Sequence, residues 1–294
     1  ESKGKHLITS KIEHSTVLKT CQALEKEGYE VTYIDVTERG VIDLEQLKNA
    51  IRNDTVAISV MYVNNETGVV QPIDEIAKMI EGKGIVLHTD AIQGVGKEMI
   101  LPKKQGIHAL SAAAHKFYGP KGTGFLYLDQ NYMIEKEITG GSQERNRRSG
   151  TENVHGIVGM AKALEIVYSD MEEEQAKEKE MQIYLEEALK EEICNIKINC
   201  GNSRRISSVV NITLEDCNVQ TLMVALDMEG ICVSGGSACM SGAMETSHVL
   251  KAMGASEEDL KSSIRVSIGR YNTKDEIDIF IQKLKEIVAR ERAK

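Results

Sequence analysis

Two side chains that follow apolar runs could together hold an electron-withdrawing ring. Asp90 ends the run IVLHTD, and a carboxylate at the end of a parallel strand can pair with a protonated pyridine nitrogen. Lys116 follows the small residues of SAAAHK, which let a flat ring approach the backbone, and a partly desolvated amine can bond to an aldehyde. This pairing predicts pyridoxal 5'-phosphate (PLP) as the cofactor. The alternatives are that Asp90 caps the next helix and that Lys116 is a surface lysine; Lys121, in the glycine-rich turn, is the weaker partner for the aldehyde.

Polar side chains after two other apolar runs add to this prediction. His14, in KIEHSTVL, could stack on a cofactor ring, although a histidine at a helix start also makes local hydrogen bonds. Asn64 and Asn65, in YVNNETG, carry amides that could bond a phenolic oxygen, although asparagine is also an ordinary turn residue. We expect these side chains to lie, with Asp90 and Lys116, at the same end of successive parallel strands.

Two residues in the second half of the chain could act on a substrate. Cys239 lies in VSGGSACMSGAM, a segment of small residues that cannot pack a core. We expect an accessible loop in which the thiol ionises and acts as a nucleophile; the alternative is a cysteine that replaces serine or alanine in a linker. Arg265, in the strand-like run SSIRVSIGR, could clamp a carboxylate through two parallel hydrogen bonds, and a structural salt bridge explains it equally well.

Composition narrows the class of partner. The 36 basic and 45 acidic side chains give a net charge of -9, which argues against nucleic acid and against an anionic membrane surface. No apolar run approaches the roughly 18 residues that a membrane span needs, and no dinucleotide or P-loop motif is present. The six cysteines form no CxxC pair, so we expect neither a metal site nor a disulfide framework. A cytoplasmic protein is expected, in which the cysteines other than Cys239 mostly fill the core.

The order of apolar runs predicts an α/β fold with two domains. From residue 6 to about 128, short apolar runs alternate with helical patterns, which is typical of βαβ units and a mostly parallel sheet. A glycine- and arginine-rich loop at 139–151 follows, and then a helical pattern from about 153 to 193. We expect a large domain, 1–165, and a smaller α+β domain, 166–294, that carries the cysteine loop. The expected helices lie near 15–27, 44–52, 73–81, 218–228, 245–253 and 273–291, and strands are expected at INC, SSVVNITL, ICVS and SIRVSI.

Seven segments resemble, in order along the chain, the motifs of the PLP-dependent cysteine desulfurases of the NifS/IscS type. These enzymes have the class V aminotransferase fold, an aspartate aminotransferase-like large domain with a smaller C-terminal domain. The resemblance covers nearly the whole chain, and the cysteine loop has the spacing of the group whose nucleophile carries sulfur to a partner. The segments are TSKIEHSTVL, VNNETGVVQPI, HTDAIQGVGK, SAAAHKFYGPKGTG, RSGTENVHGIVGMA, SGGSACMSG and IRVSIGRYNT.

The resemblance implies how the chain would bind the PLP ring. Lys116 would form the covalent bond to the cofactor, and Asp90 would pair with its pyridine nitrogen. His14 would stack on the ring and help to transfer a proton. Asn65 and Gln93 would bond the ring oxygen.

The resemblance also implies phosphate, substrate and partner contacts. His115 would bind the phosphate, and Thr151 would bind the phosphate of the neighbouring subunit in a homodimer. Arg265 would clamp the carboxylate of L-cysteine beside Asn65, and Cys239 would attack the substrate sulfur. The sulfur would pass to acceptor proteins, such as a scaffold for iron–sulfur cluster assembly, or to tRNA thiolation.

Two features depart from the family pattern. Where Ala113 stands, the family commonly has a serine that contacts the phosphate, so one hydrogen bond to a charged group, worth about 1–3 kcal/mol, is lost. The chain also opens at ESKGKHLITS, where family members already have an amino-terminal segment with a TSGATE-like phosphate loop. We therefore expect the C-terminal part of a longer enzyme, which by itself binds PLP weakly or not at all and turns over slowly.

Three hypotheses follow for the activity. The first is a cysteine desulfurase that converts L-cysteine into L-alanine and a persulfide on Cys239. The second is another PLP enzyme of the same fold, a selenocysteine lyase or an aminotransferase, of which the aminotransferase needs no thiol in the 234–242 loop. The third is a catalytically silent subunit or fragment that binds sulfur-transfer partners, which Ala113 and the absent segment favour.

Overall fold

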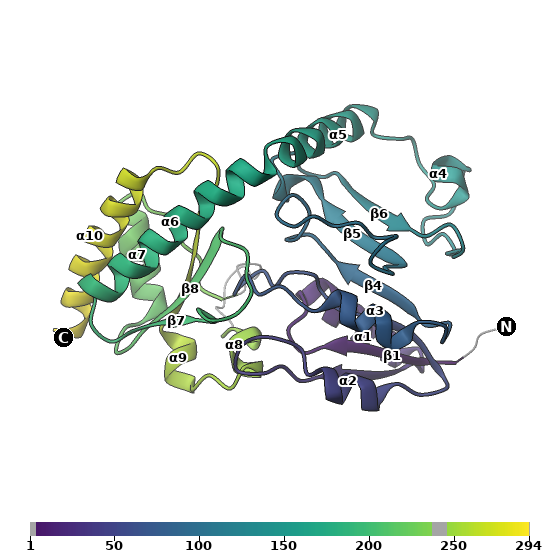
Figure 1. Ribbon diagram of the computed structural model, residues 1–294, viewed down its shortest axis with the longest axis horizontal. Helices are drawn as coiled ribbons and strands as arrows, with labels where there is room; N and C mark the ends of the chain where they lie inside the picture. The colour runs from purple at the N-terminus through teal and green to yellow at the C-terminus, as the bar shows by residue number, and fades with distance from the viewer. Residues whose placement is uncertain (1–3, 237–245, 294) are drawn as a thin grey trace.

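The alternating runs of the first half build a six-stranded sheet in the computed structural model, which describes residues 4–236 and 246–293 (Figure 1). The strand order is β2-β1-β3-β4-β5-β6; the first five strands are parallel and β6 is antiparallel to β5. This confirms the α/β fold class with a mostly parallel sheet. The strands are β1 (His6–Ser10), β2 (Glu30–Ile34), β3 (Thr55–Ser59), β4 (Val86–Asp90), β5 (Ala109–Ala113) and β6 (Gly124–Leu128).

Capping residues set where the crossover helices begin. Helix α1 (Ser15–Lys26) starts after His14, and Gly28, with φ of 87°, turns the chain away from it toward β2. Helix α2 (Leu44–Ala50) starts after Asp43, which accepts a hydrogen bond from the backbone N–H of Gln46 at 2.9 Å. Helix α3 (Ile73–Ile80) returns the chain to β4. These three helices lie where the sequence predicts them, with ends that differ by one or two residues.

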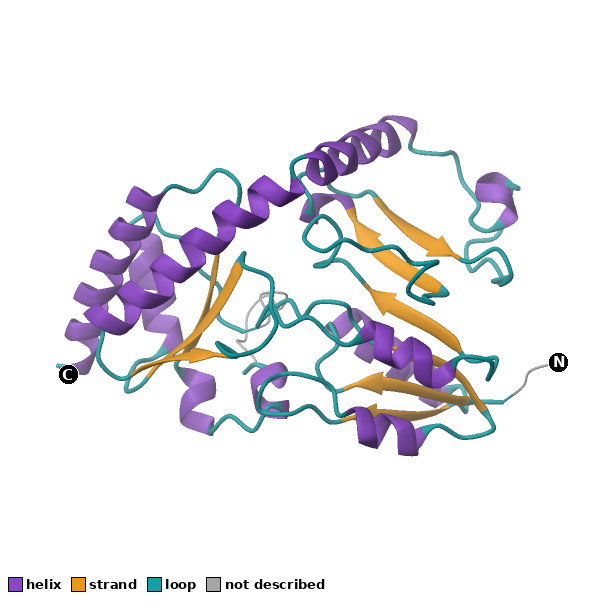
Figure 2. Cartoon of the chain, in the orientation of Figure 1, coloured by secondary structure: helices purple, strands orange, loops and turns teal. Residues whose placement is uncertain are grey.

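A smaller antiparallel sheet follows, with helices packed against one face (Figures 1 and 2). Its central strand β8 is buried along its whole length, between β7 and β9. A capping box at Thr273 and Glu276 starts the last helix. The strands are β7 (Ile196–Asn199), β8 (Val209–Leu214) and β9 (Ser263–Ser267), and the helices are α6 (Met171–Glu192), α7 (Val219–Met228) and α10 (Lys274–Arg292).

Two local predictions are wrong. The run ICVS forms no strand: Ile231 and Val233 pack against the small core, and only Ser234 makes an isolated bridge, to Arg265. The helical pattern from 153 to 193 is broken at Asp170, giving α5 (Val154–Ser169) and α6. A short helix, α9 (Glu257–Lys261), lies in a segment for which none was predicted. The predicted loop at 139–151 contains the single turn α4 (Gln143–Asn146), in which Glu144 and Arg145 have φ of 49° and 55°, outside the helical region.

A third apolar cluster joins the two sheets. Ile12 and Met61, which follow β1 and β3, pack with Val249 and Leu250 of helix α8 (His248–Ala252). The arrowheads of the parallel strands point toward this joint and toward the small sheet (Figure 2). We propose a domain boundary near residue 165, which lies within α5.

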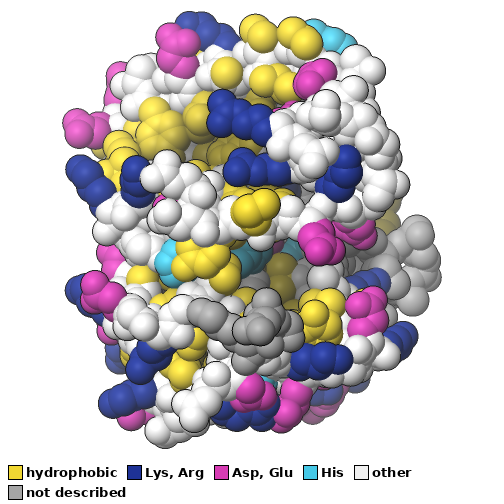
Figure 3. Space-filling model, turned by 90° about the vertical axis from the view of Figure 1, so that its right-hand side faces the viewer, with side chains coloured by type: hydrophobic (Ala, Val, Ile, Leu, Met, Phe, Trp, Pro, Cys, Tyr) yellow, Lys and Arg dark blue, Asp and Glu magenta, His cyan; other side chains and the backbone are white. Residues whose placement is uncertain are grey.

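Side chains of all kinds are mixed on the face that points away from the small sheet. Figure 3 shows hydrophobic side chains among lysines and arginines there, with acidic side chains between them. The net charge of -9 therefore does not form one acidic surface on this face. Within 4–236 and 246–293, no helix is both long enough and apolar enough to cross a membrane.

Candidate functional site

Four of the predicted site residues follow parallel strands of the large sheet. Because β1, β3, β4 and β5 run in the same direction, their carboxyl ends meet at one edge. Asp90 pairs with Ser111 in the sheet register, so the end of β4 lies beside the strand that leads to Lys116. His14 and Asn65 follow β1 and β3 at the same edge. The expected common strand end is observed, and the roles of these residues remain predictions.

Asp90 is a buried carboxylate that opens onto a cavity. Its exposed fraction is 6%, and together with His88 and Cys21 it lines a cavity of about 340 Å³ between α1 and the sheet. Its Oδ1 accepts a hydrogen bond from the backbone N–H of Ile92 at 3.0 Å, and its carboxylate makes no further hydrogen bond within the described part of the chain. This bond closes a turn, because β5 and not a helix is the next element after Asp90, so the alternative that Asp90 caps the next helix is wrong. The bond uses one carboxylate oxygen and leaves the other for a donor on a ligand.

A hydrogen-bonded row that was not predicted from the sequence crosses the sheet beside Asp90. His88 Nδ1 lies 2.8 Å from Ser59 Oγ, and His88 Nε2 lies 2.9 Å from Ser111 Oγ. Burial lowers the pKa of His88, so the imidazole is neutral and one nitrogen donates while the other accepts. The row ties β3, β4 and β5 together where Asp90 projects. The sequence alone could not predict this contact. The histidine and the two serines lie on three separate strands, and which of their residues are neighbours depends on the strand register.

His14 lies at the start of α1, with a half-buried ring. Its Nδ1 lies 2.8 Å from Thr16 Oγ1 and accepts a hydrogen bond from Thr16 N–H at 3.3 Å. The local hydrogen bonds expected of a histidine at a helix start are therefore present. The preceding Glu13 is fully buried and was missed. Its Oε1 accepts hydrogen bonds from Met61 N–H at 2.9 Å and from Ser10 Oγ at 2.5 Å. Burial raises the pKa of Glu13 to about 8, so a neutral acid joins the ends of β1 and β3 beside His14.

The turn after β3 contacts the small sheet. Asn64 Oδ1 accepts hydrogen bonds from the N–H groups of Glu66 at 2.9 Å and Thr67 at 3.0 Å, so Asn64 serves its own turn. Arg265 Nη1, on β9, donates to the backbone carbonyl of Asn65 at 2.9 Å. The structure therefore brings together two predicted substrate residues that are 200 positions apart.

The start of α8 contacts two of the strand-end turns. Ser247 Oγ donates to the buried carboxylate of Glu66, and His248 Nε2 lies 2.9 Å from the backbone oxygen of Glu13. These two contacts hold the start of α8 against the turns that carry His14 and Asn65. No periodicity or motif in the sequence indicated them, because they join segments far apart in the chain.

The other predicted cofactor residues are more exposed. His115 and Lys116 are exposed in a single 3₁₀ turn, Ala114–Lys116, directly after β5. Lys116 makes no hydrogen bond or ion pair within the described ranges. Gln93 is half-buried in the turn after β4, and Thr151 is exposed in the segment that leads to α5. Strand ends thus carry Lys116, His115 and Gln93 together with Asp90.

The cysteines differ from the prediction in part. Cys239 lies outside the described residues, so its role stays a prediction. Cys21 and Cys217 are buried as expected, but Cys194 and Cys232 are exposed. The expectation that cysteines fill the core is wrong for these two. Cys194 follows the end of α6, and Cys232 lies in the run that forms no strand.

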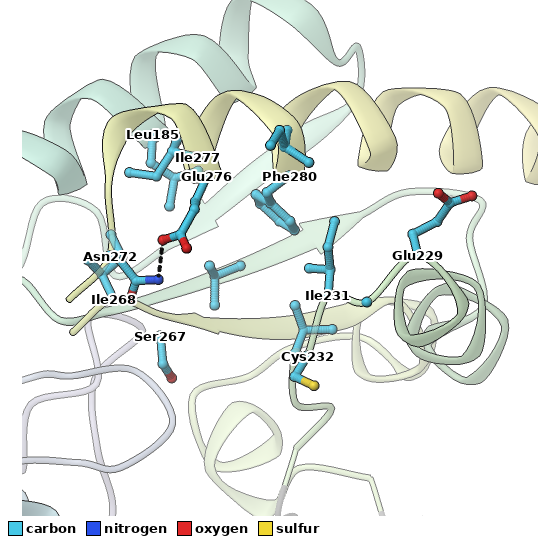
Figure 4. Close-up of a pocket in the computed structure, with 14 residues that line it drawn as sticks. Leu185, Glu229, Ile231, Cys232, Ser267, Ile268, Asn272, Glu276, Ile277 and Phe280 are labelled. Atoms are coloured by element: carbon cyan, nitrogen blue, oxygen red, sulfur yellow. Dashed lines mark hydrogen bonds between the residues drawn. The ribbon is translucent and has the colours of Figure 1, made fainter.

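A second cavity, of about 430 Å³, lies between β9, α10 and the segment 229–233 (Figure 4). Its apolar floor includes Phe280, and Cys232 lies at one side. Asn272 Nδ2 donates to Glu276 Oε2 at 3.0 Å within it. None of the predicted site residues lines this cavity. In the part of the chain that the structure describes, no cluster of His, Cys, Asp and Glu could hold a metal ion.

The strand-end residues fit PLP by the chemistry of their donors and acceptors. Asp90 offers a buried carboxylate oxygen without a hydrogen bond, which a protonated ring nitrogen requires. Lys116 offers an amine without a partner in the described ranges, preceded by alanines at 112–114 that leave room for a flat ring. The two groups belong to adjacent strands. Each group has the chemistry that one end of the cofactor needs, but Lys116, His14 and Asn65 do not line the cavity onto which Asp90 opens.

Comparisons with known proteins identify the family of the chain. The family model "Aminotransferase class-V" matches residues 2–280. Cysteine desulfurase IscS of Clostridium botulinum strain Hall is 43% identical over 294 residues, which are 99% of this chain and 74% of that protein. A solved NifS-like protein superposes with a TM-score of 0.91 at 34% identity, covering 98% of this chain and 76% of that one. A structure described as SspA in complex with cysteine has a TM-score of 0.79 at 36% identity, covering 93% and 76%. The chain belongs to the cysteine desulfurases of the class V aminotransferase family.

Proposed function

We propose that the chain uses PLP to remove sulfur from L-cysteine, producing L-alanine and leaving the sulfur on Cys239. The observation that carries this proposal is the meeting of Asp90, Lys116, His14 and Asn65 at one edge of the sheet. One of the similar solved structures is described as SspA in complex with cysteine, which supports L-cysteine as the substrate.

The residues at the strand ends would have different roles: some would bind the cofactor, and one would remove the proton from the substrate α-carbon. When bound, PLP would withdraw electrons from that carbon. Asp90 would keep the ring nitrogen protonated, and His14 would stack on the ring beside Asn65 and Gln93. The Lys116 amine would hold the cofactor and then take the proton from the substrate α-carbon. His115 and Thr151 would bind phosphate, Thr151 that of the second subunit in a homodimer.

Arg265 and Asn65 would bind the substrate carboxylate. A guanidinium has five N–H donors in a planar fork, and Nη1 of Arg265 already bonds the Asn65 carbonyl. This contact holds the guanidinium beside the turn that follows β3. The amide of Asn65 would then lie beside the carboxylate that Arg265 clamps.

The sulfur step needs one further nucleophile. The thiolate of Cys239 would attack the substrate sulfur, so that an S–S bond forms and the Cβ–S bond breaks. The electron pair of the broken bond stays with Cβ, which takes up a proton and becomes the methyl group of L-alanine. The sulfur is oxidised and Cβ is reduced, so no external oxidant is required. Acceptor proteins, such as an iron–sulfur scaffold or the machinery of tRNA thiolation in the cytoplasm, would receive the sulfur.

Production of L-alanine and sulfide from L-cysteine tests this proposal. With PLP in excess and a thiol reductant, the wild type is expected to form both products, slowly when this chain is assayed by itself, and Lys116→Ala neither. Cys239→Ser is expected to release no sulfide. Arg265→Lys keeps the charge but loses the fork, so we expect the KM for L-cysteine to rise by about tenfold or more, as for the loss of one charge-assisted hydrogen bond. Sulfide release by Cys239→Ser at the wild-type rate would contradict the proposal.

A further inference from the structure

The backbone directly after Lys116 has an unusual conformation. Tyr118 has φ of 64°, in the left-handed region that bulky side chains rarely adopt. Phe117, with an exposed fraction of 1%, anchors the turn in the core, and Gly119 N–H donates back to Ala114 O at 2.8 Å. Such a conformation persists only where surrounding contacts enforce it. The turn that carries Lys116 is therefore held under strain.

Contacts from the small sheet hold Tyr118 in this conformation. The backbone N–H of Arg270, in the β9–α10 connection, donates to Tyr118 Oη at 3.0 Å. The Arg270 guanidinium carbon lies 5.0 Å from the centroid of the Tyr118 ring, within cation–π range. The guanidinium also pairs with Glu174 and lies 3.8 Å from Asp170. Arg270 thus links Tyr118 to the start of α6.

Lys116 has no comparable support of its own. Its side chain is exposed, has four rotatable bonds and makes no hydrogen bond or ion pair within 4–236 and 246–293. The position of its amine therefore depends on the backbone from which it projects. We propose that Tyr118 is a positioning residue for Lys116, acting through its hydrogen bond to Arg270. This inference rests on the proposed function, in which Lys116 bonds to the cofactor.

Covalent labelling by PLP measures this role without an activity assay. The protein is incubated with saturating PLP, reduced with borohydride and digested, and mass spectrometry quantifies the pyridoxyl group on Lys116 and on Lys121. Lys121 is exposed in the same turn and serves as an internal control. Tyr118→Phe removes only the hydroxyl, so we expect the Lys116-to-Lys121 ratio to fall about two- to tenfold, the range for one hydrogen bond. A ratio equal to that of the wild type overturns the inference.

A substitution at Gly269 would disturb the hydrogen bond between Arg270 N–H and Tyr118 Oη from the side of the β9–α10 connection. A Cβ at Gly269, whose φ lies outside the left-handed region, would be 3.0 Å from Tyr118 Oη and 3.9 Å from Asn272 Oδ1. We expect Gly269→Ala to lower the ratio in the wild type by displacing that hydroxyl. In the Tyr118→Phe background the hydroxyl is gone, so the second change is expected to have no additional effect. If the two substitutions lowered the Lys116-to-Lys121 ratio independently, so that their effects multiplied in the double variant, Gly269→Ala would not act through the Tyr118 hydroxyl and the inference would be contradicted.

Relief of strain separates positioning from folding. Tyr118→Gly removes both the strain and the link, so we expect it to unfold at no lower temperature than the wild type while the Lys116 label falls. Asp216→Gly is the matched control, because Asp216 has φ of 59° in an exposed turn far from Lys116 in sequence. That control is expected to keep the wild-type ratio. If the wild type carries no label on Lys116, the proposed function fails and this inference with it; if it is labelled and all variants match it, only this inference fails.

Discussion

Glu13 shows how a single buried residue makes stability depend on pH. Burial raises its pKa from 4.5 to about 8, so between these values the unfolded chain loses a proton that the folded chain keeps. The unfolded state then binds fewer protons, and its contribution to the free energy of unfolding falls as pH rises through this window. A glutamine has the same shape and does not ionise. We therefore expect Glu13→Gln to gain stability relative to the wild type as pH rises from 4.5 to about 8.

Denaturant unfolding of both proteins at several pH values within that window checks this expectation. Glu45→Gln, at an exposed position of α2, controls for the loss of one negative charge. A difference between Glu13→Gln and the wild type that stays constant with pH would show that the carboxyl ionises equally in both states. The sequence could place His14 near the strand end but could not reveal Glu13 beside it, because burial of a charged residue type depends on the packing of α8 and β3.

Helix α6 is held to the large sheet by a buried ion pair. Lys97, in the turn after β4, pairs with Glu178 of α6, and the side chains are only 15% and 3% exposed. Removal of one partner leaves a buried charge uncompensated. We expect Lys97→Ala to lower the free energy of unfolding by about 3–5 kcal/mol. The control Lys162→Ala breaks a pair with Glu165 whose side chains are 62% and 68% exposed, and is expected to cost less than about 1 kcal/mol. Equal losses in the two variants would contradict this assignment.

Sequence pattern predicts the elements best where each has its own signals. The helices near 15–27 and 44–52 begin after capping side chains, the helix near 73–81 has an apolar face, and all three are present. The run ICVS fails as a strand because an apolar run shows burial but not whether a partner strand is available. The break at Asp170 has no proline or glycine to mark it, so the two helices could not be separated by their sequence.

The molecule as a whole gathers its candidate site from both sheets. Parallel strand order brings the turns after β1, β3, β4 and β5 together, and the sequence could predict this from alternation alone. The contacts of Arg265 with Asn65 and of Ser247 with Glu66 join residues 200 and 181 positions apart. Local pattern carries no information on such pairs. The roles of Gln93, His115 and Thr151 came only from resemblance to the family.

The central claim is that sulfur leaves L-cysteine at this strand-end edge and reaches Cys239. The most direct measurement is mass spectrometry of the protein, loaded with PLP and quenched after brief exposure to L-cysteine without a reductant. The account predicts one additional sulfur atom on the peptide that contains Cys239 and an equal amount of L-alanine. L-alanine formed without sulfur on that peptide, or sulfur found instead on the exposed Cys232 in a Cys239→Ser variant that still turns over, would contradict it.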